Sequence, residues 1–160
     1  MLPKLILRLA ATTVMALALL ANAGAQSRDA AMAMVRALNL GSNLPSMTYR
    51  MSKLTQTQQG VVLRLGPVQA DELLRAEIAA VVPKYQDKWD QNLAQAWAPL
   101  MSAEEFKSIA DKRQQSPFAS KFLSMQNQAG ATMQSTSEPL LTEVVSEVMG
   151  RVWEKASKGK

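Results

Sequence analysis

The chain has 160 residues, a formal net charge of +5 from 18 basic and 13 acidic residues, and neither histidine nor cysteine. Histidine is the commonest general base and metal ligand, and the cysteine thiolate is a frequent nucleophile and zinc ligand. A Ser-His-Asp triad, a Cys-His pair, a zinc site with the usual ligands and any disulfide are therefore excluded within this chain. We expect a protein that is not an enzyme, with no catalytic residue, no cofactor and no metal site.

The first residues have the pattern of a secretory signal peptide. Two basic residues precede an apolar run over 9–21, and small residues follow it. This pattern predicts a signal peptide over 1–23, with cleavage after Ala23 or Ala25. The alternative is a retained membrane anchor, but the run is shorter than the roughly 20 residues that a transmembrane helix needs. We expect a periplasmic or secreted protein of a Gram-negative bacterium, with no stable membrane span after cleavage.

Residues 24–160 are long enough for a single domain with a hydrophobic core. Loss of Lys4 and Arg8 with the signal peptide leaves sixteen basic and thirteen acidic residues, a net charge of +3. Nucleic-acid-binding proteins are far more basic, so no nucleic-acid partner is expected. Because the domain has no disulfides, its stability has to come from packing.

Apolar residues recur at helical spacing through most of this domain. The first helix is expected from near Asp29 to Gly41. A second is expected over 46–65, continuing past a weak point at Gly60 and ending at Gly66-Pro67.

A longer apolar stripe runs over 71–100 at steps of three and four residues. Pro83 lies inside this stripe, so we expect the helix to kink or split near Val82. Tyr85, Trp89 and Trp97 share the stripe. Their spacing favours packing in the core over an aromatic ligand site.

Two helix starts follow in the segment "SAEEFKSIADKRQQSPFASKF" over 102–122. Ser102 and Glu105 have the spacing of a capping box. Ser116 and Pro117 fit the N-cap and first position of the next helix. The segment therefore predicts two helices joined by a sharp turn, as in an antiparallel hairpin.

Basic residues gather near this turn, and Lys112, Arg113 and Lys121 form a weak candidate partner surface. They could bind an anionic polymer or a phosphate at a helix start. A solvated, charged turn is the preferred interpretation.

The last helix is expected to start at Ser137, as a cap, with Pro139 in its first turn. Lysines at its end suit the negative pole of a helix. The fold class that we predict is all-α: a single compact helical bundle of about five to seven helices, after a cleaved signal peptide.

Several features resemble a known family of exported bacterial proteins. They are Tyr85 in a helical region, Ser102 with Glu104 and Glu105 at a helix start, and Ser116-Pro117 with Ala119 and Lys121 at a later one. With these features, residues 74–134 resemble the family called domain of unknown function 2059. The chain departs from it at Gln114-Gln115, where an aromatic pair is frequent, and at Ala119, where glycine is common. The resemblance implies an all-helical envelope domain and no particular activity.

Three classes of function stay open. The first is a non-catalytic periplasmic interaction or accessory module, whose partner is an unknown envelope protein held between helices. The second is binding of a lipid or another apolar small molecule in the helical core, where flexible methionines are common. The third is an enzyme with Ser, Lys or carboxylate chemistry. The sequence predicts neither the ligand nor the oligomeric state.

Overall fold

Seven α-helices and no strand make up residues 24–158, the part of the chain that the computed structural model describes. The all-α class and the predicted number of helices are confirmed. The predicted signal peptide over 1–23 lies outside the described residues.

The first described helix spans 24–37. The others are α2 (Leu44–Lys53), α3 (Gln56–Leu65), α4 (Pro67–Val81), α5 (Pro83–Trp97), α6 (Ala103–Lys112) and α7 (Ala119–Lys158), with a 3₁₀ turn over Arg113–Gln115.

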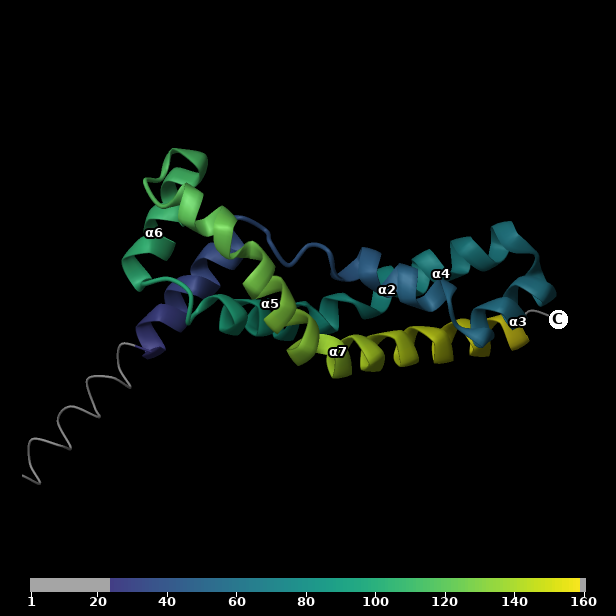
Figure 1. The fold of residues 1–160 in the computed structure, drawn as a ribbon. Helices are drawn as coiled ribbons and strands as arrows, with labels where there is room; N and C mark the ends of the chain where they lie inside the picture. Colours follow the sequence, from purple (N-terminus) through teal and green to yellow (C-terminus); the bar gives the residue numbers. More distant parts are fainter. Residues whose placement is uncertain (1–23, 159–160) are drawn as a thin grey trace, which may run out of the picture.

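The helices form an elongated bundle in which α5 and α7 connect the two ends (Figure 1). Buried side chains form two clusters. The α4 cluster joins α2, α3 and α4 to α5 and to the C-terminal part of α7, around Leu74 and Val148. The α6 cluster joins the 24–37 helix, α5 and α6 to the first part of α7, around Met34 and Phe106. Leu93 of α5 packs against both clusters, so one apolar core continues from end to end.

The aromatic stripe of α5 lies in this core, as predicted. Tyr85, Trp89 and Trp97 are all buried. The Trp97 ring stacks on Phe122 of α7 with 4.5 Å between ring centroids. The Trp89 indole donates to the Asn43 side chain over 3.0 Å, which satisfies its polar atom inside the bundle.

The predicted break at Pro83 is also confirmed, because α4 ends at Val81 and α5 starts at Pro83. The expected start at Asp71 is wrong by one turn. Gly66 ends α3 with φ 80°, a conformation that favours glycine, and Pro67 is suited to the first position of α4.

The expected single helix over 46–65 is two helices. The break lies at Leu54 and Thr55, because the Thr55 side chain accepts from the Gln58 amide and starts α3. Gly60, expected to be the weak point, lies inside α3. The Trp153 ring packs over it so closely that a Cβ atom there would be 3.3 Å from that ring.

The first helix also begins earlier than Asp29, since the described part is helical from residue 24. Gly24 and Arg28 line a hollow together with Gln95, Ala98 and Pro99 at the end of α5. The expected start at Asp29 is therefore too late, and Asp29 lies within the helix.

The expected helix start at Ser137 is wrong, because α7 runs without a break from Ala119 to Lys158 with Pro139 inside it. Ser137 is buried in the helix interior, where its hydroxyl accepts from the Asn92 amide over 3.1 Å and donates to the sulfur of Met133 over 3.0 Å. Proline costs one backbone bond and bends a helix, and the α7 ribbon changes direction about halfway along its length (Figure 1). The bond from Asn92 joins the middle of α7 to α5 just before this proline.

Candidate functional site

The predicted capping box at the start of α6 is present. The Ser102 hydroxyl accepts from the Glu105 amide over 3.3 Å, and the Glu105 carboxylate accepts from the Ser102 amide over 2.8 Å. Lys121 also donates to this carboxylate. That hydrogen bond, followed by the one from the Ser102 backbone, lowers the pKa of Glu105 below its ordinary value. These residues fix the α6–α7 corner.

Ser116 shapes the turn into α7, although α7 starts later than expected. Its buried hydroxyl accepts from the Phe118 amide over 3.2 Å and shares a 2.8 Å hydrogen bond with Ser108 of α6. Pro117 is not the first helical residue, because the chain first makes a tighter turn, in which the Ala119 amide donates to the Ser116 carbonyl over 3.0 Å. Ser116 thus joins α6 to the entry of α7.

Replacement of this hydroxyl tests its structural role. Ser116→Ala is expected to lower the free energy of unfolding by about 1–2 kcal/mol, because it leaves two hydrogen-bonding groups without their partner. Ser120→Ala is the matched control, since Ser120 is exposed on the first turn of α7. Urea denaturation measures both variants. An unchanged stability of Ser116→Ala would contradict a structural role for this hydroxyl.

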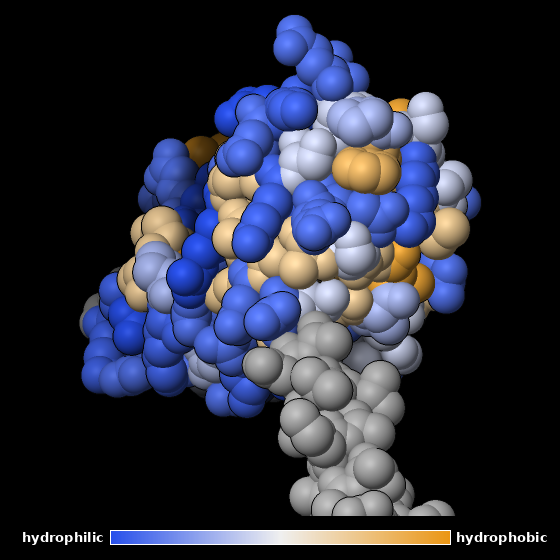
Figure 2. All heavy atoms as spheres, turned by 90° about the vertical axis from the view of Figure 1, so that its left-hand side faces the viewer, coloured by the Kyte–Doolittle hydropathy of each residue, from blue (hydrophilic) through white to orange (hydrophobic). Residues whose placement is uncertain are grey.

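The candidate partner surface of Lys112, Arg113 and Lys121 is only partly assembled. The Lys121 ammonium lies 2.8 Å and 2.9 Å from the two Glu105 oxygens, so its charge is neutralised. Lys112 and Arg113 are exposed and make no ion pair with a described residue. Seen from this end, hydrophilic side chains form most of the outline, and apolar residues, some weakly and some strongly hydrophobic, lie between them (Figure 2). Lys112, Arg113 and Lys121 therefore form a charged turn and not a continuous cationic surface.

A better-formed surface lies between α2 and α4 and is called the α2–α4 groove below. It is open to solvent, with a volume of about 730 Å³. Its apolar lining is Pro45, Ile78, Ala79, Val82 and Pro83, and its polar lining is Ser46, Tyr49, Arg75 and Gln86.

Helical spacing explains how α4 and Val82, the residue that follows it, form one wall of the groove. Arg75, Ile78, Ala79 and Val82 follow one another at steps of three, one and three, which places them on one face. Ile78 and Val82 also belong to the buried α4 cluster, so the groove has a floor fixed by the core. A rigid floor needs little reorganisation when a partner binds.

A polar cluster closes one end of the groove. The Asp71 carboxylate accepts from the Tyr49 hydroxyl, from the Arg75 guanidinium over 2.7 Å and from Lys53 over 3.3 Å. The Arg75 guanidinium also lies over the Tyr49 ring, 4.4 Å from its centroid. The hydrogen bond from Tyr49, and then that from Arg75, lower the pKa of Asp71 to about 2. Asp71 is therefore ionised at neutral pH and holds the cluster together.

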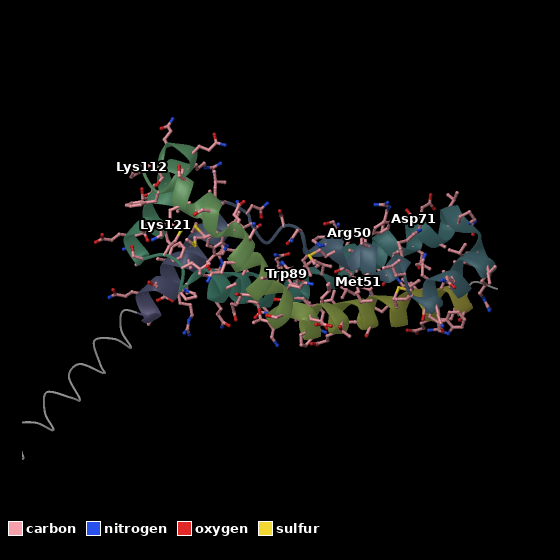
Figure 3. All side chains as sticks on the ribbon, in the orientation of Figure 1. Arg50, Met51, Asp71, Trp89, Lys112 and Lys121 are labelled. Carbon is pink, nitrogen blue, oxygen red and sulfur yellow. The ribbon has the colours of Figure 1, made fainter. Side chains whose placement is uncertain are left out.

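The two candidate surfaces are far apart. Figure 3 shows Arg50 and Asp71 in the half of the molecule that contains the groove, and Lys112 and Lys121 at the α6 end. They cannot form one site within a single chain.

The sequence analysis did not predict the α2–α4 groove. Asp71 and Arg75 are spaced for an ion pair on one helix, and this was the only local signal. Tyr49 lies 22 residues before Asp71, so its approach depends on how α2 packs against α4.

Two further features bear on the site's chemistry. Within residues 24–158, no three His, Cys, Asp or Glu side chains gather where they could hold a metal ion. None of the helices in that range combines the length and hydropathy of a membrane span.

No protein-family model, curated protein or solved structure matches the chain.

Proposed function

We propose that this protein is a non-catalytic interaction module of the bacterial envelope that binds a helix of another protein in the α2–α4 groove. The observation that carries the proposal is an open groove between two helices, with a fixed apolar floor and one polar end. An amphipathic helix that lays its apolar side into such a groove is a recurrent mode of protein recognition.

The openness of the groove favours a protein segment over a small molecule. Small-molecule sites usually bury about 70–90% of the ligand's surface. A lipid chain in the open α2–α4 groove would stay partly in water, whereas a partner helix brings the rest of its own protein to cover its outer side. The apolar-ligand alternative is therefore the second candidate.

The location in the envelope has separate support. The signal-peptide pattern over 1–23 favours export, and the resemblance of residues 74–134 to an exported family favours the same compartment. An enzyme has less support, because the acid beside Tyr49 and Arg75 is Asp71, whose carboxylate is already occupied by hydrogen bonds from Tyr49, Arg75 and Lys53.

Crosslinking from two neighbouring alanines tests the proposal. Ala79 lines the groove, and Ala80 is also exposed but lies about 100° further around α4 and does not line it. A photoreactive amino acid is placed at either position of the full chain in living cells. We expect Ala79 to give one dominant protein crosslink that maps to a helical segment, and Ala80 to give little of it.

A second variant shows whether the captured segment occupies the groove. Ala79→Trp fills the groove and should abolish binding of the identified segment, measured with purified protein. Equal crosslinking from both alanines, or binding that survives Ala79→Trp, would overturn the proposal. A lipid as the crosslinked species at Ala79 would overturn it in favour of the apolar-ligand alternative.

A further inference from the structure

Arg75 is the only charged residue among those that line the α2–α4 groove, and its side chain is 63% exposed. Two contacts hold its guanidinium in place. Its Nε donates to Asp71 over 2.7 Å, and its plane lies on the Tyr49 ring. The side chain is thus oriented before any partner arrives.

The rest of the guanidinium has unused donors. Within residues 24–158, its terminal nitrogens, Nη1 and Nη2, donate to no protein atom. The Asp71 carboxylate contacts this guanidinium through Nε alone, at Oδ2, while its Oδ1 accepts from Tyr49 and Lys53. The groove therefore presents a fixed fork of N–H groups at its polar end.

A carboxylate is the partner that this fork fits. Paired N–H groups of arginine bind the two oxygens of a carboxylate in parallel, and such charge-assisted bonds are stronger than neutral ones. A docked helix would exclude water from Arg75, and a buried guanidinium without new hydrogen bonds would oppose docking.

The surrounding charges leave room for one more acid. Arg75 and Lys53 face a single carboxylate, that of Asp71. The polar end of the groove keeps one positive charge in excess.

We propose that the helix bound in the α2–α4 groove carries an aspartate or glutamate whose carboxylate pairs with the Nη atoms of Arg75, so that Arg75 selects acidic partners. This inference rests on the proposed function. A fatty acid also carries a carboxylate that could pair with Arg75. We favour an acid on a protein helix, because the open groove would leave the chain of a fatty acid partly in water.

A peptide selection tests this inference without knowledge of the natural partner. The probe is a displayed library of amphipathic helices with fixed apolar positions and randomised polar positions. It is selected on the purified protein, expressed as the full chain, and separately on Arg75→Gln. Arg64→Gln is the control for loss of one positive charge, since Arg64 is an exposed arginine of α3 that does not line the groove.

We expect binders of the wild type and of Arg64→Gln to be enriched in Asp or Glu at one helical position, and binders of Arg75→Gln to lack this enrichment. In a binder from the wild-type selection, Glu→Gln at that position should weaken affinity about tenfold or more. The same change should have little effect on binding to Arg75→Gln. Arg75→Lys should give an intermediate affinity, because lysine keeps the charge without the fork.

The outcomes separate the two proposals. Groove binders without an enriched acid, or with an enrichment that Arg75→Gln keeps, overturn the role of Arg75 and leave the proposed function standing. Binders that are insensitive to Ala79→Trp contradict the groove itself. Arg75-dependent binding of oleate, measured by native mass spectrometry, together with no groove-dependent peptide, would overturn both in favour of a lipid ligand.

Discussion

Phe106→Ala is expected to lower the free energy of unfolding by about 3–5 kcal/mol. Phe106 is fully buried in the α6 cluster, on the inward face of a helix only ten residues long. Its removal loses the free energy gained by burying an aromatic ring away from water. It also leaves a cavity, and α6 is short and fixed by its cap, so it has little freedom to move in and fill that cavity. Denaturation in guanidinium chloride, with the change in midpoint read at constant slope, measures the loss.

The control for Phe106→Ala is a substitution at an apolar residue of α7 that is exposed and lies outside the core. Leu123 is 62% exposed, so Leu123→Ala should change stability by no more than about 0.5 kcal/mol. A similar loss in both variants would mean that the α6 cluster does not contribute as a packed core.

The Phe106→Ala variant also tests whether the α4 cluster and the α6 cluster unfold together. The α5 and α7 helices run through both, and Leu93 packs against both, so loss of one cluster removes support from the other. We expect one transition, coincident by circular dichroism and by fluorescence from Trp89 in the α4 cluster and Trp97 in the α6 cluster. Two transitions in the variant would show that the ends of the bundle are independent units.

The sequence predicts the parts of this fold that depend on local chemistry. Helical periodicity is strong enough to give the all-α class, and the breaks at Gly66 and Pro83 follow from the backbone properties of glycine and proline. The capping box at Ser102 and Glu105 is local in the same sense, since both partners lie within one turn.

The errors occur where tertiary packing decides between local alternatives. Ser137 has the chemistry of a helix cap, yet it is buried inside α7, and Pro139 lies within the same helix. Thr55 starts a helix without any proline or glycine beside it. The α2–α4 groove belongs to the same class, because it exists only after Tyr49 of α2 meets Asp71 and Arg75 of α4.

The second large effect is expected at Glu77, a buried acid that joins α4 to α7. Its side chain is 2% exposed, and its carboxylate accepts from Arg151 over 2.6 Å and from Lys155. Glu77→Gln should lower the free energy of unfolding by about 2–3 kcal/mol at pH 7, since it removes the charge from two charge-assisted hydrogen bonds in a buried place. The loss should stay below that for a fully buried ion pair, because Arg151 and Lys155 are about half exposed and regain water.

Glu154→Gln is the matched control. Glu154 pairs with Lys158 on the exposed side of α7, and exposed pairs of this kind contribute about 0–1 kcal/mol. An equal effect of the two substitutions would show that burial adds nothing to the Glu77 interaction.

The pH dependence gives an independent test of the same residue. Burial alone would raise the pKa of Glu77, but hydrogen bonds from Lys155 and Arg151 outweigh it, and the pKa is lowered in the folded protein. The stabilisation is therefore complete above the unfolded pKa of about 4.3 and is lost as the pH falls through the lower folded value. Asp71, whose pKa is about 2, adds a loss over the same acidic range in wild type and variant alike. The difference between wild type and Glu77→Gln, measured by urea denaturation from pH 7 to pH 3, should thus be constant down to about pH 5 and then narrow. A difference that widens toward acid would mean that Glu77 is protonated in the folded protein at neutral pH and that the ion pair does not hold α4 to α7.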